Sequence, residues 1–201
     1  MRIISPTLLV SLSLVVACGQ SKPSENKQEQ VKTEKMEITE IVFKPDSTIN
    51  SQIFLHNPSS TVKVLGDIMS LIDADEALPS AYFKSQNGKE YLKVVFFPGN
   101  EANSISQFTV GHSVNLSNSE KPNPVRLITF QTESDIRLGM TKQELLSIKG
   151  SRYREEGATL TYTIDDASFP FLSKFNMPIY VAEYSFKNGK LDKFKFGFEY
   201  P

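Results

Sequence analysis

The sequence has no tryptophan, one cysteine and two histidines among its 201 residues. A single cysteine excludes a disulfide framework within the chain and a cysteine-rich zinc site. The two histidines, His56 and His112, leave little material for a histidine metal centre or a catalytic triad. An excess of one charge is also missing, because 22 Lys and Arg stand against 23 Asp and Glu, a formal net charge of −1. The chain therefore lacks the basic surplus of a nucleic-acid-binding protein.

The N-terminal apolar stretch is too short to span a membrane. It runs from Leu8 to Ala17 and is interrupted by Ser11 and Ser13, whereas a spanning helix needs roughly 20 residues. Arg2 precedes it and supplies the positive charge that opens a secretory signal peptide. Residues 1–17 are therefore predicted to be a signal peptide.

The only cysteine directly follows this stretch. Val15-Val16-Ala17-Cys18 resembles the lipobox of bacterial lipoproteins, in which the cysteine thiol takes a diacylglycerol and becomes the first residue of the mature chain. This resemblance implies that Cys18 carries acyl chains such as palmitate. It also implies an anchor in the bacterial outer membrane, with the folded part facing the periplasm or, alternatively, the cell surface. The competing interpretation is an inert, buried cysteine beside an ordinary cleavage site.

Residues 18–37 are predicted to be the lipidated cysteine and a disordered tether. After Cys18 the stretch is rich in Gln, Ser, Lys and Glu, and its charges of both signs are interspersed. Such a composition has too little apolar surface to offset the entropy of ordering. As a flexible coil, the 19 residues after the cysteine span about 25 Å.

The strongest helix signal begins at Thr141. Thr141 and Glu144 are spaced as a capping box, and Met140 and Leu145 as a hydrophobic staple. Gly150 stands where a helix C-terminal glycine is expected. A weaker version of this layout runs from Asn57 and Pro58 to Gly66.

Strand patterns follow both helix signals. In the first half, residues 82–86 and 91–97 flank an Asn-Gly turn, and residues 106–115 and 125–131 could add two strands. In the second half, even-numbered aromatic residues alternate with polar residues around Asn188-Gly189. A three-residue loop there would keep all even-numbered residues on one face. We therefore predict an α+β fold with two tandem helix-then-antiparallel-sheet repeats, residues 38–132 and 133–201, packed as one two-part body.

The segment from Ile136 to Gly150, followed by aromatic strands, is similar to the repeat of the BamE (SmpA/OmlA) lipoproteins. The duplicated helix-then-sheet unit resembles the β-lactamase-inhibitor protein fold. The resemblance covers about residues 136–200 and more faintly 53–131. It departs from the BamE pattern after Gly150, where Ser151 and Arg152 replace the common proline. The resemblance implies a support role in an envelope machine, or inhibition of a hydrolase.

No motif in the sequence selects catalytic residues, a cofactor or a metal site. Gly111-His112-Ser113 places a histidine beside a serine, but adjacent strand residues point to opposite faces. Asp73, Asp75 and Glu76 resemble a fragment of a calcium loop without its glycine and distal glutamate, so a solvated loop is the simpler interpretation, and cation binding is left open.

The candidate partner-binding residues are five large apolar side chains between Pro170 and Pro178 or next to them: Phe169, Phe171, Leu172, Phe175 and Met177. The two prolines argue against a continuous regular element there. One hypothesis is that these side chains are exposed anchors for a protein partner. The other is that they fold inward and close an open end of the core.

Together these patterns favour a non-enzymatic, lipid-anchored protein-binding or envelope-assembly module. Its expected partners are the membrane, through Cys18, and a protein of the cell envelope. The alternative is a protein inhibitor of an envelope or extracellular hydrolase. An enzyme or a small-ligand binder comes last, since no motif supports either.

Overall fold

A computed structural model describes residues 41–68, 71–72, 78–97, 104–117 and 121–199. They belong to one compact unit that begins at Thr39. The predicted signal peptide, Cys18 and the predicted tether lie outside the described residues.

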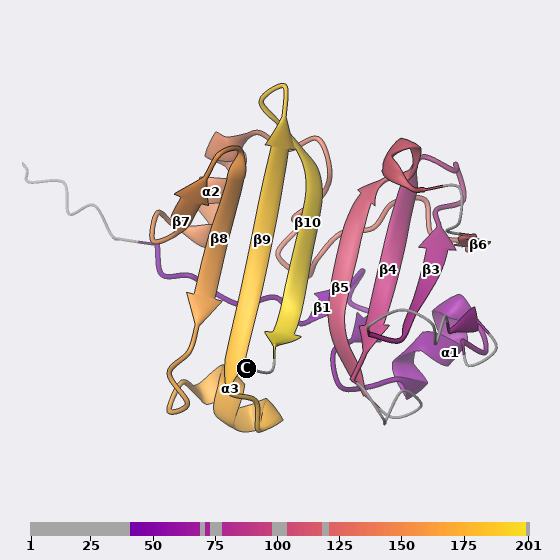
Figure 1. The fold of residues 1–201 in the computed structure, drawn as a ribbon, viewed down its shortest axis with the longest axis horizontal. Coiled ribbons are helices and arrows are strands. Elements are labelled where there is room, and N and C mark those ends of the chain that lie inside the picture. Colours follow the sequence, from indigo (N-terminus) through magenta and orange to yellow (C-terminus); the bar gives the residue numbers. More distant parts are fainter. Residues whose placement is uncertain (1–40, 69–70, 73–77, 98–103, 118–120, 200–201) are drawn as a thin grey trace, which may run out of the picture. The chain divides into compact units, whose positions relative to one another are not determined.

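Eight strands form one mixed sheet in the order β6-β3-β4-β5-β10-β9-β8-β7 (Figure 1). They are β3 (Ser80–Lys84), β4 (Glu90–Phe96), β5 (Ile105–His112), β6 (Asn123–Pro124), β7 (Arg154–Glu156), β8 (Thr159–Ile164), β9 (Ile179–Lys187) and β10 (Lys190–Glu199). Neighbours are antiparallel except β3 and β6. Two short strands, β1 (Thr48–Ile49) and β2 (Ile53–Phe54), pair separately. The helices are α1 (Ser59–Leu65), α2 (Lys142–Lys149) and α3 (Pro170–Phe175).

The predicted α+β class with two tandem repeats is wrong, because the described chain is mostly β and its three α-helices are short. Strands β5 and β10 pair directly, with Phe108 opposite Phe196, so one sheet runs through both expected repeats. Helix α1 has seven residues and no side-chain cap, and its main contacts are with β2 rather than with the eight-stranded sheet. The strand expected at residues 125–131 is also absent there, and only the two-residue β6 forms just before it.

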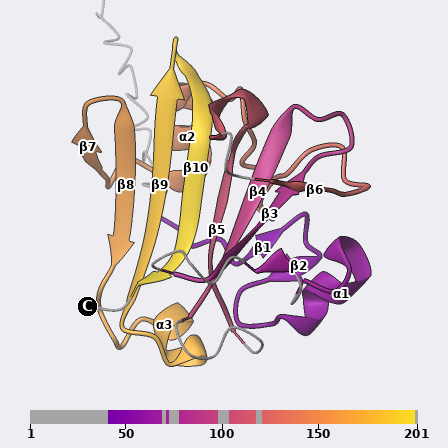
Figure 2. The same ribbon diagram turned by 45° about the vertical axis from the view of Figure 1, so that its right-hand side comes forward.

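The core lies on one face of the sheet. Phe194 and Phe196 of β10 stand opposite Tyr184 and Ala182 of β9, and all four are at most 1% exposed. Helix α2 lies behind the sheet in both views, behind β7 and β8 in Figure 1 and behind β9 and β10 in Figure 2. Leu145 of α2 is fully buried in the same core. Burial on one face follows from the period-two pattern of the aromatic strands.

The β9–β10 connection differs from the predicted three-residue loop. Lys187 pairs directly with Lys190, so the loop holds only Asn188 and Gly189, both at positive φ. A two-residue loop alone would place odd- and even-numbered residues on the same face. A bulge between Leu191 and Lys193 restores the alternation, because Asp192 is an extra residue in β10. The aromatic residues therefore share one face as predicted, but through a bulge.

Two local predictions are confirmed. The Thr141 side chain accepts from the Glu144 amide and the Glu144 carboxylate accepts from the Thr141 amide, which completes the capping box of α2. Gly150 ends the helix at φ +79°, and a Cβ there would lie 2.1 Å from the Ile41 carbonyl oxygen. Strands β3 and β4 form the hairpin expected around Asn87-Gly88, with Lys84 opposite Tyr91.

Candidate functional site

The face of the sheet opposite the core, here called the outer face, has no described helix in front of β8, β9 and β10 (Figures 1 and 2). Its side chains alternate with those of the core along each strand. The outer face consists of Tyr82 on β3, Tyr91, Lys93 and Val95 on β4, Gln107, Thr109 and Gly111 on β5, Lys193, Lys195 and Gly197 on β10, Val181, Glu183 and Ser185 on β9, and Thr159, Thr161 and Thr163 on β8. Hydroxyl and lysine side chains dominate this face on β8, β9 and β10.

Two tyrosines lie flat on the β3–β4–β5 part of the outer face. The Tyr91 ring crosses Gly111, where a Cβ would lie 2.6 Å from Tyr91 Cε1, so only glycine leaves room for the ring. The Tyr82 and Tyr91 ring centroids are 6.5 Å apart, and Lys93 Nζ lies 4.9 Å from the Tyr82 centroid. Both tyrosines are less than 10% exposed. This part of the face is therefore packed and pre-ordered.

The β9–β10 part of the outer face carries a small charge network. Lys195 Nζ lies 3.0 Å from Glu199 Oε1 and 3.9 Å from Glu183 Oε1, and all three side chains are partly exposed. Beside them, the Thr159 and Ser185 hydroxyls share a hydrogen bond of 3.0 Å. These groups give this part of the face partly exposed hydrogen-bonding and charged atoms.

A hollow of about 300 Å³ lies where the outer face ends, between β4, β5 and β10. It is lined by Leu78, Phe96, Phe97, Ser106, Gln107, Lys195, Phe198 and Glu199. At Gly197 the strands approach so closely that a Cβ would lie 2.2 Å from the Ser106 carbonyl oxygen. The Gln107 amide donates to the Phe198 carbonyl at 3.1 Å, so the end of β10 is held against β5.

The hollow has an apolar wall and a charged rim. Its volume stands at the lower limit of small-molecule pockets, and its lysine and one glutamate already pair with each other. The described lining holds no nucleophile next to a general base.

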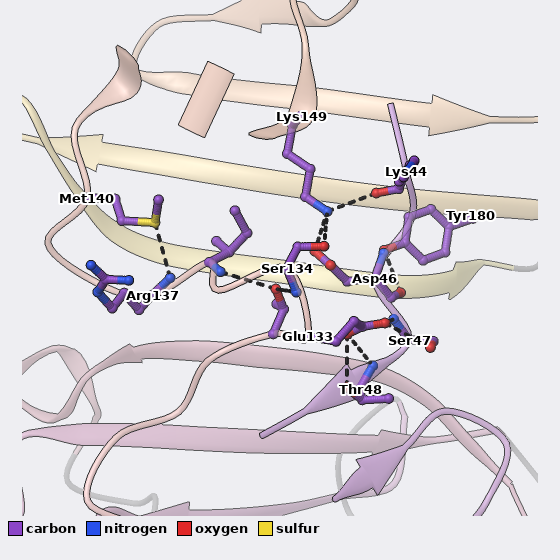
Figure 3. A network of polar contacts seen from close by, with 12 residues as sticks. Lys44, Asp46, Ser47, Thr48, Glu133, Ser134, Arg137, Met140, Lys149 and Tyr180 are labelled. Atoms are coloured by element: carbon purple, nitrogen blue, oxygen red, sulfur yellow. Dashed lines mark hydrogen bonds and ion pairs between the residues drawn. The ribbon is translucent and has the colours of Figure 1, made fainter. Parts of the chain in front are cut away.

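A buried polar network attaches the first described segment to α2 and β9 (Figure 3). Lys149 Nζ lies 2.7 Å from Asp46 Oδ2, and both side chains are fully buried. The same amine donates to the Lys44 carbonyl oxygen at 2.8 Å. The Tyr180 hydroxyl donates to the Asp46 carbonyl at 2.9 Å and accepts from the Asp46 amide at 3.0 Å. Glu133 binds the backbone amides of Ser47 and Thr48 from the other side.

The electrostatics of this network are those of a structural pair. Burial raises the pKa of the Asp46 carboxyl and lowers the pKa of the Lys149 amine, and their mutual attraction opposes both shifts. Because neither side chain reaches solvent, neither can exchange protons with a substrate. Sequence reasoning missed this network, since 134 positions separate Asp46 from Tyr180.

His56 lies in a cage of phenylalanine rings that the sequence did not reveal. Its ring centroid is 5.0 Å from that of Phe198, 5.2 Å from Phe97 and 5.5 Å from Phe175. Its Nε2 is buried and has no hydrogen-bond partner among the described residues. Burial lowers the pKa of this imidazole. The cage lies beside the hollow, because Phe97 and Phe198 line both.

The five candidate partner-binding residues lie on or beside α3. Leu172 and Met177 are at most 5% exposed, and Phe169, Phe171 and Phe175 are partly buried against the core. The Phe171 centroid is 5.3 Å from Tyr180 and 5.8 Å from Phe198. These contacts agree with the packing alternative, and binding of a partner through these rings stays an untested prediction.

No single regular element spans the stretch between the two prolines, but a short helix forms within it. Residues Pro170–Phe175 form α3, with Pro170 at its first helical positions and Asn176 at φ +52° just after its end. A proline at the start of a helix costs no backbone hydrogen bond, because the first amides have no partner within the helix.

Asp73, Asp75 and Glu76 lie outside the described residues. Within the described part of the chain, the acidic, histidine and cysteine side chains form no cluster of three or more that could hold a metal ion. No described helix is both long enough and apolar enough to cross a bilayer. No family model, curated protein or solved structure matches the chain.

Proposed function

We propose that this chain is a lipid-anchored protein-binding module of the bacterial envelope, held by Cys18 at the outer membrane and facing the periplasm. The observation that carries the binding role is the outer face of the eight-stranded sheet, which no described helix covers over β8, β9 and β10 (Figure 1). The lipid anchor is supported by the position of the only cysteine directly after the apolar stretch.

Three features of the outer face support a protein partner. Tyr91, which crosses Gly111, and the neighbouring Tyr82 are already packed, which reduces the entropy lost on binding. Lysines, threonines and glutamates provide hydrogen bonds and charge pairs around them. The adjoining hollow offers a place for one apolar side chain of the partner.

The test replaces single outer-face residues by a photo-crosslinking amino acid in the full chain, in cells. Thr109 and Thr161 represent the two halves of the outer face, and Lys63 on α1 serves as the control at an exposed position away from it. We expect both outer-face positions to crosslink the same protein and Lys63 to crosslink none. Crosslinks at Lys63 alone, or at no position, would contradict the proposal.

The identity of the crosslinked protein separates the two functional hypotheses. An integral or peripheral envelope protein supports an assembly module. A soluble hydrolase that loses activity when the chain is added supports the inhibitor hypothesis, with the same outer face as the binding surface.

A further inference from the structure

Several connections meet at the end of the sheet where β3 turns into β4 and β9 turns into β10 (top of Figure 1). The Ser113 amide donates to the Lys89 carbonyl at 2.8 Å, which ties the turn after β5 to the β3–β4 turn. Asn115 Nδ2 donates to Asp192 Oδ2 at 3.1 Å, which ties the same turn to the start of β10. The Gln86 amide donates to the Leu127 carbonyl at 2.7 Å, so residues 125–128 lie against the β3–β4 turn from its other side.

Two aliphatic side chains project into solvent from this end. Val114 is 90% exposed and Ile128 is 64% exposed. They flank the β3–β4 turn, since Val114 follows the residue bonded to Lys89 and Ile128 follows the residue bonded to Gln86. Exposing two branched aliphatic groups this fully is unfavourable in water unless something else covers them.

The charged side chains around them are mostly basic. In residues 85–89, 113–117, 125–129 and 187–192 the sequence has four basic side chains and one carboxylate. The basic residues are Lys89, Arg126, Lys187 and Lys190, and all four are exposed. The carboxylate, Asp192, accepts a hydrogen bond from Asn115. None of the four cations has an ion-pair partner among the described side chains.

The neighbouring carboxylates offset part of this charge. Glu144 is near enough to Lys190 for that lysine to help lower the pKa of its carboxyl. Glu155 and Glu156 of β7 are paired with Lys142 and Arg154.

Glu90, at the start of β4, is partly buried, and its Oε2 accepts a hydrogen bond from the Phe130 amide at 2.8 Å. Two more lysines lie close by. Lys193 is exposed and directly follows Asp192 in β10, and Lys84 is half-buried at the end of β3. A chain with a net charge of −1 therefore carries a local cationic end.

We propose that this end of the sheet, the tip surface formed by Lys89, Val114, Arg126, Ile128, Lys187 and Lys190, docks on an anionic lipid surface. Isolated aliphatic side chains enter the boundary between headgroups and acyl chains, while the lysines and arginine bind the negative headgroups. A protein partner fits less well, because the tip surface offers no tyrosine or tryptophan and no hollow among its described residues. This contact is additional to the lipid on Cys18 and does not depend on it.

Such docking would fix the orientation of the outer face relative to the lipid surface. The tip surface lies at the ends of the strands, so the strands would point towards the lipid and the outer face would stand beside it, open to a partner. The hollow and the His56 cage would then lie at the end of the sheet that is farther from the membrane.

The absence of tryptophan allows a direct test, because a single substitution introduces the only indole into the full chain. Val114→Trp and Ile128→Trp report on the tip surface, and Val62→Trp is the control, at a 60%-exposed position on α1. Each variant is mixed with vesicles of phosphatidylglycerol and phosphatidylethanolamine or of phosphatidylcholine alone. Flotation of the vesicles reports separately whether the chain is attached at all.

In the anionic vesicles we expect a blue shift of the emission and quenching by brominated acyl chains for Val114→Trp and Ile128→Trp, but not for Val62→Trp. Both effects should fall in phosphatidylcholine and at high salt, because the attraction to the headgroups is screened. Adding Lys89→Glu and Lys190→Glu to Val114→Trp should abolish them. A chain that floats while the tip-surface tryptophans stay fully solvated would overturn the docking proposal and leave the lipid anchor intact.

Discussion

At the scale of single residues, Asp46 and Lys149 join the first described segment to the end of α2. Removing one member of a buried pair leaves the other charge uncompensated, which costs about 3–5 kcal/mol. We therefore expect Lys149→Met to lower the midpoint of urea denaturation strongly. Lys142→Met is the matched control, since Lys142 pairs with Glu155 at 2.8 Å but both side chains are at least 40% exposed, and exposed pairs contribute little. Equal effects of the two substitutions would contradict the structural role of the buried pair.

His56 should make stability depend on pH. Burial among phenylalanines lowers the pKa of its imidazole below the ordinary value of 6.5. The unfolded chain therefore binds this proton at a higher pH than the folded chain does, and stability is lost as the pH falls below about 6.5. His56→Asn should flatten the dependence between pH 8 and pH 5.5, because asparagine tolerates the positive φ of this position and does not titrate. Parallel denaturation curves in which both chains lose the same stability would show that His56 is not responsible.

At the scale of elements, the start of α2 depends on the Thr141 hydroxyl. It accepts from the Glu144 amide. In return the Thr141 backbone amide and then the hydroxyl donate to the Glu144 carboxylate and lower the pKa of that carboxyl. Loss of such a cap costs about 0.5–2 kcal/mol. Thr141→Ala should lower the denaturation midpoint accordingly, whereas Thr141→Ser should restore it. If Thr141→Ser were as unstable as Thr141→Ala, the hydroxyl would not be the cause.

The bulge in β10 makes a stronger prediction. Deleting Asp192 alone should remove the bulge and still leave Phe194 opposite Tyr184, because Lys193 then follows Leu191 directly and keeps its place opposite Ser185. We expect this chain to retain cooperative unfolding in circular dichroism. Deleting Asp192 and Lys193 together should turn every later residue of β10 over, so that Phe194, Phe196 and Phe198 face the solvent, and should abolish cooperative unfolding. Equal behaviour of the two deletions would contradict this explanation of the register.

These elements also show which parts of the fold could be predicted from the sequence. Thr141, Glu144 and Gly150 act over a few positions, and so do Asn87 and Gly88, so their structures could be predicted from local spacing. The similarity between Asn57–Gly66 and Thr141–Gly150 led to a wrong prediction, because matching start and stop signals do not show against which element a helix packs. The pairing of β5 with β10 joins residues that are far apart in the chain, and the sequence of neither strand indicates which strand it will pair with.

At the scale of the whole molecule, the two faces of the sheet have different surroundings. One face is filled by aromatic residues and covered by α2, and the polar network around Asp46 attaches the leading segment to it. The other face stays open over β8, β9 and β10. The sequence predicts the candidate site at Phe169, Phe171, Leu172, Phe175 and Met177, because large apolar residues are its only sequence signal. The open face has no such signal, since its threonines and lysines are typical of any solvated strand.

The proposed anchor at Cys18 would give the outer face its place in the cell envelope. The most direct test is the intact mass of the mature chain, extracted with detergent from envelopes of the native bacterium. We expect a chain that begins at Cys18 and carries a diacylglycerol with its acyl chains, and we expect Cys18→Ser to leave the precursor uncleaved. A mature chain with an unmodified cysteine, or one that retains residues 1–17, would contradict the account.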